Sequence, residues 1–140
     1  MASIEKFEDL EVWQRAREIC LYVEYLFTET KLGSNYTLRN QMKRSSGTIM
    51  DNIAEGFDRD GNKEFHQFLS IAKASTSELK SQTYRAFDKI LISEIQFNQL
   101  KDLCEIEKNK IGALMAYLRK TDQKGLKYKK HREPSTKNNV

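Results

Sequence analysis

Apolar residues recur at every third or fourth position through most of the chain, which is the spacing of one face of an α-helix. No stretch shows the alternation that a half-buried β-strand requires. The pattern predicts four helices, at about residues 8–30, 36–57 or 59, 62–91 and 93–120. The only proline, Pro134, follows all four of them, so none is interrupted by proline.

Each predicted helix carries one apolar stripe that should face a shared core. In the first two helices the stripe consists of Leu10, Trp13, Ala16, Ile19 or Cys20, Val23 and Leu26 or Phe27, and of Leu38, Met42, Ser45, Ile49, Ile53 and Gly56. In the last two it consists of Phe65, Phe68 or Leu69, Ala72, Ser75 or Thr76, Leu79, Thr83, Ala86 and Ile90, and of Leu100, Leu103, Glu107, Ile111, Leu114 and Leu118.

Small and polar residues mark where the helices begin and end. We expect Gly33 to terminate the first helix, and Ser34 or Asn35 to cap the second. Asn62 and Ser93 are the expected N-caps of the third and fourth helices, because their side chains can accept a hydrogen bond from an orphan amide.

Helices of similar length joined by short loops favour antiparallel neighbours. We therefore expect residues 1–120 to form one all-α domain, an antiparallel up-down-up-down four-helix bundle. Residues 121–140 carry six basic and two acidic side chains, which accounts for the whole net charge of +4. This segment is predicted to be a disordered basic C-terminal tail.

The second helix is unusual because polar and small residues lie on or beside its apolar stripe. Ser45, Ser46 and Gly47 would let another backbone approach closely, and Gly56 would do so or would loosen the helix end. Buried amides need hydrogen-bond partners. Two interpretations remain open, a polar seam inside one bundle and a contact between subunits, and the residues concerned are Gln41, Ser45, Asn52, Glu55 and Arg59.

Several aromatic residues lie off or beside the stripes, which indicates a surface for a partner. They are Tyr22, Phe57, Phe87, Phe97 and Tyr117.

Three segments, LEVWQRAREI, QMKRSSGTIMDNIAEGFDR and KEFHQFLSIAKASTSEL, carry a family resemblance. In this order they resemble the four-helix-bundle proteins encoded in intervening sequences of bacterial large-subunit ribosomal RNA genes. That family also resembles the accessory proteins of diversity-generating retroelements. Many relatives have a proline before the NIAEG run, where this chain has Met50 and Asp51.

The resemblance covers about residues 7–120 and implies a homo-oligomer, a pentamer in known members. It also implies association with nucleic acid and, for the retroelement relatives, with a reverse transcriptase.

The sequence contains no catalytic constellation that we can identify. Glu64 and His66 lack the Glu-x-x-His spacing of a di-iron bundle, and the other histidine, His131, lies in the tail. Asp51 and Glu55 have Arg44 and Arg59 within helical reach, which favours ion pairs over a metal site. Phosphate-binding and nucleophile motifs are absent. We therefore expect a protein that is not an enzyme and has no metal or cofactor.

Basic residues are the best candidates for function. Arg39, Lys43 and Arg44 form a basic patch early in the second helix. The tail segment KGLKYKKHR adds Lys124, Lys127, Lys129, Lys130 and Arg132, with Tyr128 able to stack on a base. A solubilising tail without a ligand is the alternative interpretation of this composition.

These features predict a non-enzymatic homo-oligomeric bundle that binds nucleic acid, most plausibly RNA, through phosphate contacts. The alternative is a protein-interaction scaffold, such as a reverse-transcriptase accessory protein. No membrane-spanning run or signal-peptide pattern is present, so we expect a cytoplasmic location. Cys20 and Cys104 are expected to be buried, reduced thiols.

Overall fold

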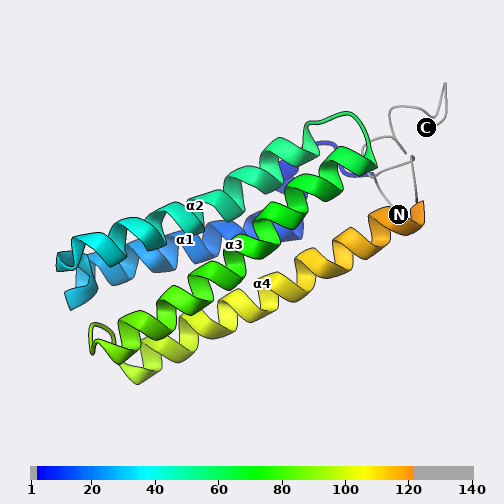
Figure 1. The fold of residues 1–140 in the computed structure, drawn as a ribbon. Helices are drawn as coiled ribbons and strands as arrows, with labels where there is room; N and C mark the ends of the chain where they lie inside the picture. Colours follow the sequence, from blue (N-terminus) through cyan, green and yellow to red (C-terminus); the bar gives the residue numbers. More distant parts are fainter. Residues whose placement is uncertain (1–2, 122–140) are drawn as a thin grey trace.

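The computed structural model describes residues 3–121, which form an all-α protein (Figure 1). Its four long helices are α1 (Glu11–Glu29), α2 (Tyr36–Phe57), α3 (Asn62–Asp88) and α4 (Glu94–Thr121). Two short 3-10 helices, η1 (Phe7–Asp9) and η2 (Lys31–Ser34), precede α1 and α2. None of residues 3–121 lies in a β-strand, as the hydrophobic pattern predicts.

The helices pack in sequence order, with α1 against α2, α2 against α3, α3 against α4, and α4 back against α1. Consecutive helices run in opposite directions along one long axis (Figure 1). This arrangement confirms the predicted up-down-up-down four-helix bundle. The predicted tail lies outside the described residues from position 122 onward.

The core consists largely of the predicted apolar stripes. In α2, the side chains of Leu38, Met42, Ile49 and Ile53 are almost completely buried, and the stripes of the other helices meet them in the interior. Burying one such side chain contributes roughly 1.5–3 kcal/mol to folding. The stripe of α4 includes one charged residue, Glu107, whose exposed fraction is 0%.

Two of the predicted helix caps are confirmed. The Asn35 side chain accepts a hydrogen bond from the Leu38 amide at 3.2 Å. The Ser93 hydroxyl accepts one from the Gln96 amide at 3.1 Å, and the Gln96 side chain accepts one from the Ser93 amide at 2.9 Å. The second pair is a capping box, which satisfies two orphan amides reciprocally.

The prediction that Asn62 caps α3 is wrong. Gly61 occupies the N-cap position with φ of 111°, a conformation that glycine adopts readily, and Asn62 is the first helical residue. The Asn62 side chain is buried and donates from Nδ2 to the Leu118 carbonyl at 3.3 Å and to Thr121 Oγ1 at 3.1 Å. Its role is therefore to tie the start of α3 to the end of α4.

Gly33 does not terminate α1 as predicted, because the helix already ends at Glu29 and Thr30 follows as its C-cap. Gly33 lies in η2, where a Cβ atom would be 1.9 Å from the Phe27 carbonyl oxygen. The chain therefore needs glycine here for a close backbone approach and not to end a helix.

Ile90 was expected on the apolar stripe of the third helix, but it is 78% exposed. The helix ends at Asp88, and Ile90 follows with φ of 59°. The Leu91 amide donates to the Ala86 carbonyl at 2.9 Å, which is the 6→1 bond of a Schellman motif. The helical periodicity therefore stops before Ile90, and the side chain points away from the core.

Two of the five off-stripe aromatics, Phe57 and Phe97, are unavailable for the partner surface that the pattern indicated. Phe57 and Phe97 are buried, while Tyr22, Phe87 and Tyr117 pack against the core. The Phe97 ring stacks on the Phe87 ring, with 4.6 Å between the centroids. The large apolar side chains that are exposed are different ones, namely Leu21, Tyr25, Tyr36, Ile71, Tyr84, Ile90, Ile95 and Ile106.

The two cysteines differ in environment. Cys104 is buried, and this burial raises the pKa of its thiol to about 12. Cys20 is only half-buried, and its Sγ donates to the Ser46 carbonyl at 3.3 Å. The prediction of a buried, reduced thiol is therefore confirmed for Cys104, whereas Cys20 is reduced but partly accessible.

Candidate cationic sites

The basic patch predicted in the second helix lies near the N-terminal end of α2. Lys43 and Arg44 are exposed and form no ion pair with any of residues 3–121. Arg39 is half-buried, because its Nη1 donates to the Gly33 carbonyl at 3.3 Å and its guanidinium lies over the Tyr36 ring at 4.6 Å. Arg39 is thus partly committed to the fold, and Lys43 and Arg44 are the freer cations.

Arg85 of α3 joins this patch, and sequence reasoning missed it. Its Nη1 donates to Gln41 Oε1 of α2 at 2.9 Å, and Gln41 precedes Arg44 by about one helical turn. Only the antiparallel register of α2 and α3 brings these residues together, so no local motif could have revealed it. We define the α2 patch as Arg39, Lys43, Arg44 and Arg85.

The five residues predicted as a polar seam or subunit contact lie in three different environments. Ser45 is buried between α2 and α3, where its hydroxyl is 2.6 Å from Gln82 Oε1 and donates to it. Asn52 is half-buried, and its Nδ2 donates to the Thr48 carbonyl at 2.9 Å. The other three residues lie at the bundle surface. Gln41 accepts a hydrogen bond from Arg85 there, and Glu55 and Arg59 form an ion pair. The five therefore do not form one continuous buried seam.

Apart from Glu107, the buried polar side chains of residues 3–121 lie on α2 and α3, and Ser45 is the one among them from the predicted set. They are Ser45, Ser46, Asn62, Ser75, Thr76, Gln82 and Thr83, and the Ser45–Gln82 bond joins the two helices. The hydroxyls of Ser46 and Thr83 donate to carbonyls of their own helices, at 3.1 and 2.8 Å. Each buried group thereby avoids the penalty of roughly 1–3 kcal/mol for an unpaired polar atom.

The NIAEG segment forms a packing unit at the end of α2. Gly56 lies against Phe68 of α3, and a Cβ atom on Gly56 would be 2.5 Å from the Phe68 Cβ. Arg59 covers the same ring, with 4.9 Å from its guanidinium carbon to the centroid, and it pairs with Glu55 at 2.9 Å. The expected ion pair between Glu55 and Arg59 is present, and the segment closes the α2–α3 contact.

Gly47, in contrast, has no neighbour that a Cβ atom would meet within 4 Å. The expectation that Gly47 permits a close backbone approach is therefore wrong within this chain, because the residue faces open space.

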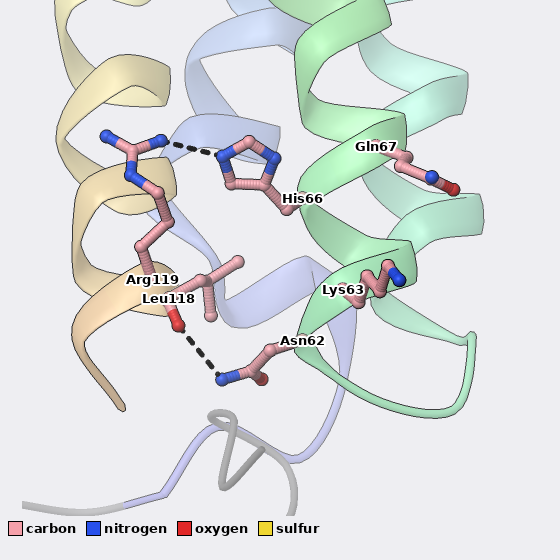
Figure 2. Close-up of a pocket in the computed structure, with 6 residues that line it drawn as sticks. All are labelled: Asn62, Lys63, His66, Gln67, Leu118 and Arg119. Carbon is pink, nitrogen blue, oxygen red and sulfur yellow. Dashed lines mark hydrogen bonds between the residues drawn. The ribbon is translucent and has the colours of Figure 1, made fainter. Parts of the chain in front are cut away.

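A second cationic site lies at the opposite end of the bundle, where α3 begins and α4 ends (Figure 2). It is an open hollow of about 590 Å³ that we call the α3–α4 hollow. Its lining residues are Asn62, Lys63, His66, Gln67, Leu118 and Arg119.

His66 and Arg119 face each other across the hollow (Figure 2). Arg119 Nη1 and His66 Nε2 are 2.7 Å apart. Because the guanidinium can only donate, Nε2 accepts and the imidazole is neutral in this arrangement. Burial, together with the nearby Arg119 charge, lowers the pKa of His66.

The α2 patch and the α3–α4 hollow are well separated. From Arg39 to Phe57, α2 rises by roughly 27 Å at about 1.5 Å per residue. Thr121, the last residue of α4, contacts Asn62 at the hollow. The predicted tail cations Lys124, Lys127, Lys129, Lys130 and Arg132 follow Thr121 in sequence, but they lie outside the described residues.

Glu107 is the one buried side chain in residues 3–121 whose oxygens both lack a hydrogen-bond partner. Burial raises its pKa to about 8. Arg15 opposes this shift, while Glu11 and Glu18 reinforce it. Glu107 lies in the core and does not face either cationic site, so it affects stability more than recognition.

No group of three or more His, Cys, Asp or Glu side chains in residues 3–121 is arranged to hold a metal ion. No helix in this part of the chain is long and apolar enough to cross a membrane.

The fold and these sites together define a small four-helix bundle with cations at both ends that form no ion pair within residues 3–121. Residues 8–113 match the family described as 23S rRNA-intervening sequence protein, and the chain belongs to that family.

A solved structure confirms the fold. The chain resembles a crystal structure from Bacteroides thetaiotaomicron, described as a protein with unknown function from the S23 ribosomal protein family, with a TM-score of 0.67. The two are 17% identical, and the similarity covers 75% of this chain and 95% of the other. No curated protein matches the chain significantly.

Proposed function

We propose that this protein is a homo-oligomer that binds nucleic acid, with RNA the first candidate, through contacts to phosphates. The observation that carries the proposal is that the α2 patch takes part in no ion pair within residues 3–121. The ion pairs within residues 3–121 involve Arg15, Arg59, Lys80 and Lys110, and none involves Arg39, Lys43, Arg44 or Arg85. Exposed cations without carboxylate partners are the groups that neutralise a polyanion.

Oligomer formation supports binding through avidity. A single subunit presents few cations at either end, so its contacts with phosphates are individually weak. Repetition of the same cations around an assembly, a pentamer in the first instance, raises the effective concentration of each further contact. Exposed Leu21 and Tyr25, one turn apart on α1, are candidates for burial between subunits.

RNA is the first polyanion to test because the family is described by its connection to 23S rRNA. The full-length chain is titrated into a fluorescent structured RNA at 50, 100 and 200 mM salt, and anisotropy reports binding. We expect Lys43→Gln combined with Arg44→Gln to weaken binding and to reduce the salt slope by about 1.5–2. Arg17→Gln combined with Lys108→Gln removes the same charge from exposed positions elsewhere and is the matched control.

The tail is tested in the full-length chain by replacing its five cations, Lys124, Lys127, Lys129, Lys130 and Arg132, with glutamine. We expect weaker RNA binding, a salt slope reduced by roughly 4 and an unchanged mass by light scattering. A monomeric wild-type protein that binds no RNA at 50 mM salt contradicts the proposed function.

A protein-interaction scaffold is the second candidate, and one observation favours it. Ile90, in the turn between α3 and α4, and Ile95, in the first turn of α4, are 78% and 82% exposed. Exposed isoleucines suit a protein partner better than a phosphate backbone. A reverse transcriptase is the partner to test if the gene lies beside one, and an oligomer that ignores RNA at 50 mM salt would favour this function.

A further inference from the structure

The α3–α4 hollow carries positive charge that forms no ion pair within residues 3–121. Lys63 and Arg119 line it, and neither takes part in an ion pair within residues 3–121. The other lining side chains among residues 3–121 are His66, two amides and one leucine, so this part of the chain contributes no carboxylate to the lining. Residues 3–121 therefore leave both cations available to an anion that enters the hollow.

The hollow has a structured floor. Asn62 is only 7% exposed, and its Nδ2 donates to the Leu118 carbonyl. The Thr121 hydroxyl donates to the same carbonyl at 3.4 Å. These two donors cover an oxygen that would otherwise repel an anion.

The charge of the hollow is determined by its side chains and not by the helix dipoles. The positive end of α3 and the negative end of α4 both terminate beside the hollow, so their effects oppose each other. The lysine and the arginine carry full charges and therefore outweigh the remaining difference.

The Arg119–His66 contact adds an adjustable donor. Arg119 donates one of its N–H groups to His66, and its remaining N–H groups can donate to a ligand. A guanidinium binds phosphate oxygens in a bidentate manner, which lysine cannot do. If an anion draws Arg119 toward itself, His66 can take up a proton and become a second cationic donor.

We propose that the α3–α4 hollow is a binding site for a phosphoryl group, held by Arg119, Lys63 and protonated His66. The inference deepens the proposed function, on which it rests, by assigning one phosphate contact of the bound RNA to this end of the bundle. The phosphoryl group can be an internal phosphodiester, a terminal monoester or free phosphate, since all three present the same oxygens.

The test follows the imidazole signals of the full-length, ¹⁵N-labelled protein by NMR while inorganic phosphate is added at constant ionic strength. We expect the pKa of His66 to rise as phosphate binds. The other histidine, His131, lies between Lys130 and Arg132, so its signal separates phosphate binding by the tail segment from binding at the hollow.

Two variants remove one cation each. Arg119→Gln should weaken phosphate binding about tenfold or more, because it removes a charge-assisted bidentate contact. Lys63→Gln should also weaken binding while leaving the Arg119–His66 contact in place. Lys108→Gln, which removes an exposed charge from the middle of α4, should leave binding unchanged and is the matched control.

RNAs of one sequence, with and without a 5′-phosphate, identify the source of the group. An equal response of His66 to both indicates phosphodiesters, a response to the phosphorylated RNA alone indicates the terminal monoester, and a response to inorganic phosphate alone indicates the free ion. A His66 signal that ignores all three probes, or that responds equally in Arg119→Gln and wild type, overturns the inference.

The experiments distinguish a refuted phosphoryl site from a refuted proposed function. RNA binding that persists through Lys43 and Arg44 without a response of His66 refutes only the phosphoryl site. A complete absence of RNA binding refutes the proposed function, whereas inorganic phosphate still tests the hollow independently.

Discussion

Gly56 of α2 and Phe68 of α3 are so close that the glycine cannot be exchanged for any other residue without movement. A Cβ atom on Gly56 would be 2.5 Å from the Phe68 Cβ and 3.1 Å from Cδ1 of Phe65. The nearest of these atoms lies at the base of the side chain, so a rotamer change of Phe68 cannot relieve the clash. The glycine of the NIAEG run thus sets the distance between α2 and α3.

Gly56→Ala should therefore destabilise the bundle. Overpacking of a core contact costs about 1–3 kcal/mol, and the better helix propensity of alanine offsets up to about 1 kcal/mol of this. Gly47→Ala is the matched control in the same helix and should stabilise the protein by up to about 1 kcal/mol, because its Cβ would meet nothing within 4 Å. Urea unfolding measures both, and equal effects would contradict this packing.

Ser45→Ala should cost about 1–3 kcal/mol, because it leaves the buried Oε1 of Gln82 without its hydroxyl donor. Replacing Gln82 with leucine as well should recover part of this loss, since no orphan acceptor then remains. Circular dichroism during urea unfolding of the two single variants and the double variant gives the coupling energy. Strictly additive losses would show that the two side chains do not interact.

Glu107→Leu should stabilise the protein, and the gain should increase with pH. The pKa of Glu107 is about 8 in the folded chain and 4.5 for an ordinary glutamate, so the folded state binds the proton more tightly. Stability from this group is complete below pH 4.5 and declines as the pH rises toward 8. At about 1.4 kcal/mol per pKa unit, the loss at pH 7 is on the order of 3 kcal/mol.

The measurement is the difference in unfolding free energy between Glu107→Leu and wild type at pH 5, 7 and 8.5. Glu105→Gln is the control on the same helix. Its hydrogen bond with Lys80 lowers the pKa of Glu105, so the difference should stay flat above pH 6. A gain for Glu107→Leu that does not vary with pH would contradict a protonated buried carboxyl.

Ile90→Gly should stabilise the turn between α3 and α4 by about 1 kcal/mol. A β-branched residue with φ of 59° is strained, and glycine adopts this conformation without strain. The lost side chain is 78% exposed, so little buried area is given up. Ile95→Gly, an exposed position inside α4, should instead lower the thermal unfolding midpoint, and equal shifts for both variants would argue against strain at Ile90.

Local periodicity was sufficient to predict the helices and most of the core. Leu38, Met42, Ile49 and Ile53 recur at helical spacing, and all of them are buried. The same reasoning failed at Ile90, because the apolar spacing continues in the sequence beyond Asp88, where the helix ends. It also failed for Phe57 and Phe97, because a core shared by four helices covers a wider arc than one stripe.

The candidate sites depend on contacts between helices, which the sequence pattern does not contain. The α2 residues of the patch were predicted because they are close in sequence. Arg85 belongs to the patch because it donates a hydrogen bond to Gln41, which is 44 positions away. The hollow was missed entirely, because Lys63 and Arg119 are distant in sequence and each is unremarkable alone. Asn62 was assigned to a local cap because its bonds to Leu118 and Thr121 are visible only in three dimensions.

Because the bundle has four antiparallel helices, α4 ends at the same end of the bundle at which α1 begins (Figure 1). Glu11 near the start of α1 pairs with Lys110 in the second half of α4, at 3.3 Å, so the first and last helices enter and leave the bundle on the same side. A fluorophore, affinity handle or surface tether attached beside the first residues of α1 will therefore leave the distant tip, with Lys43 and Arg44, unobstructed. Single-molecule assays can anchor the protein in this way and present that tip to a passing strand.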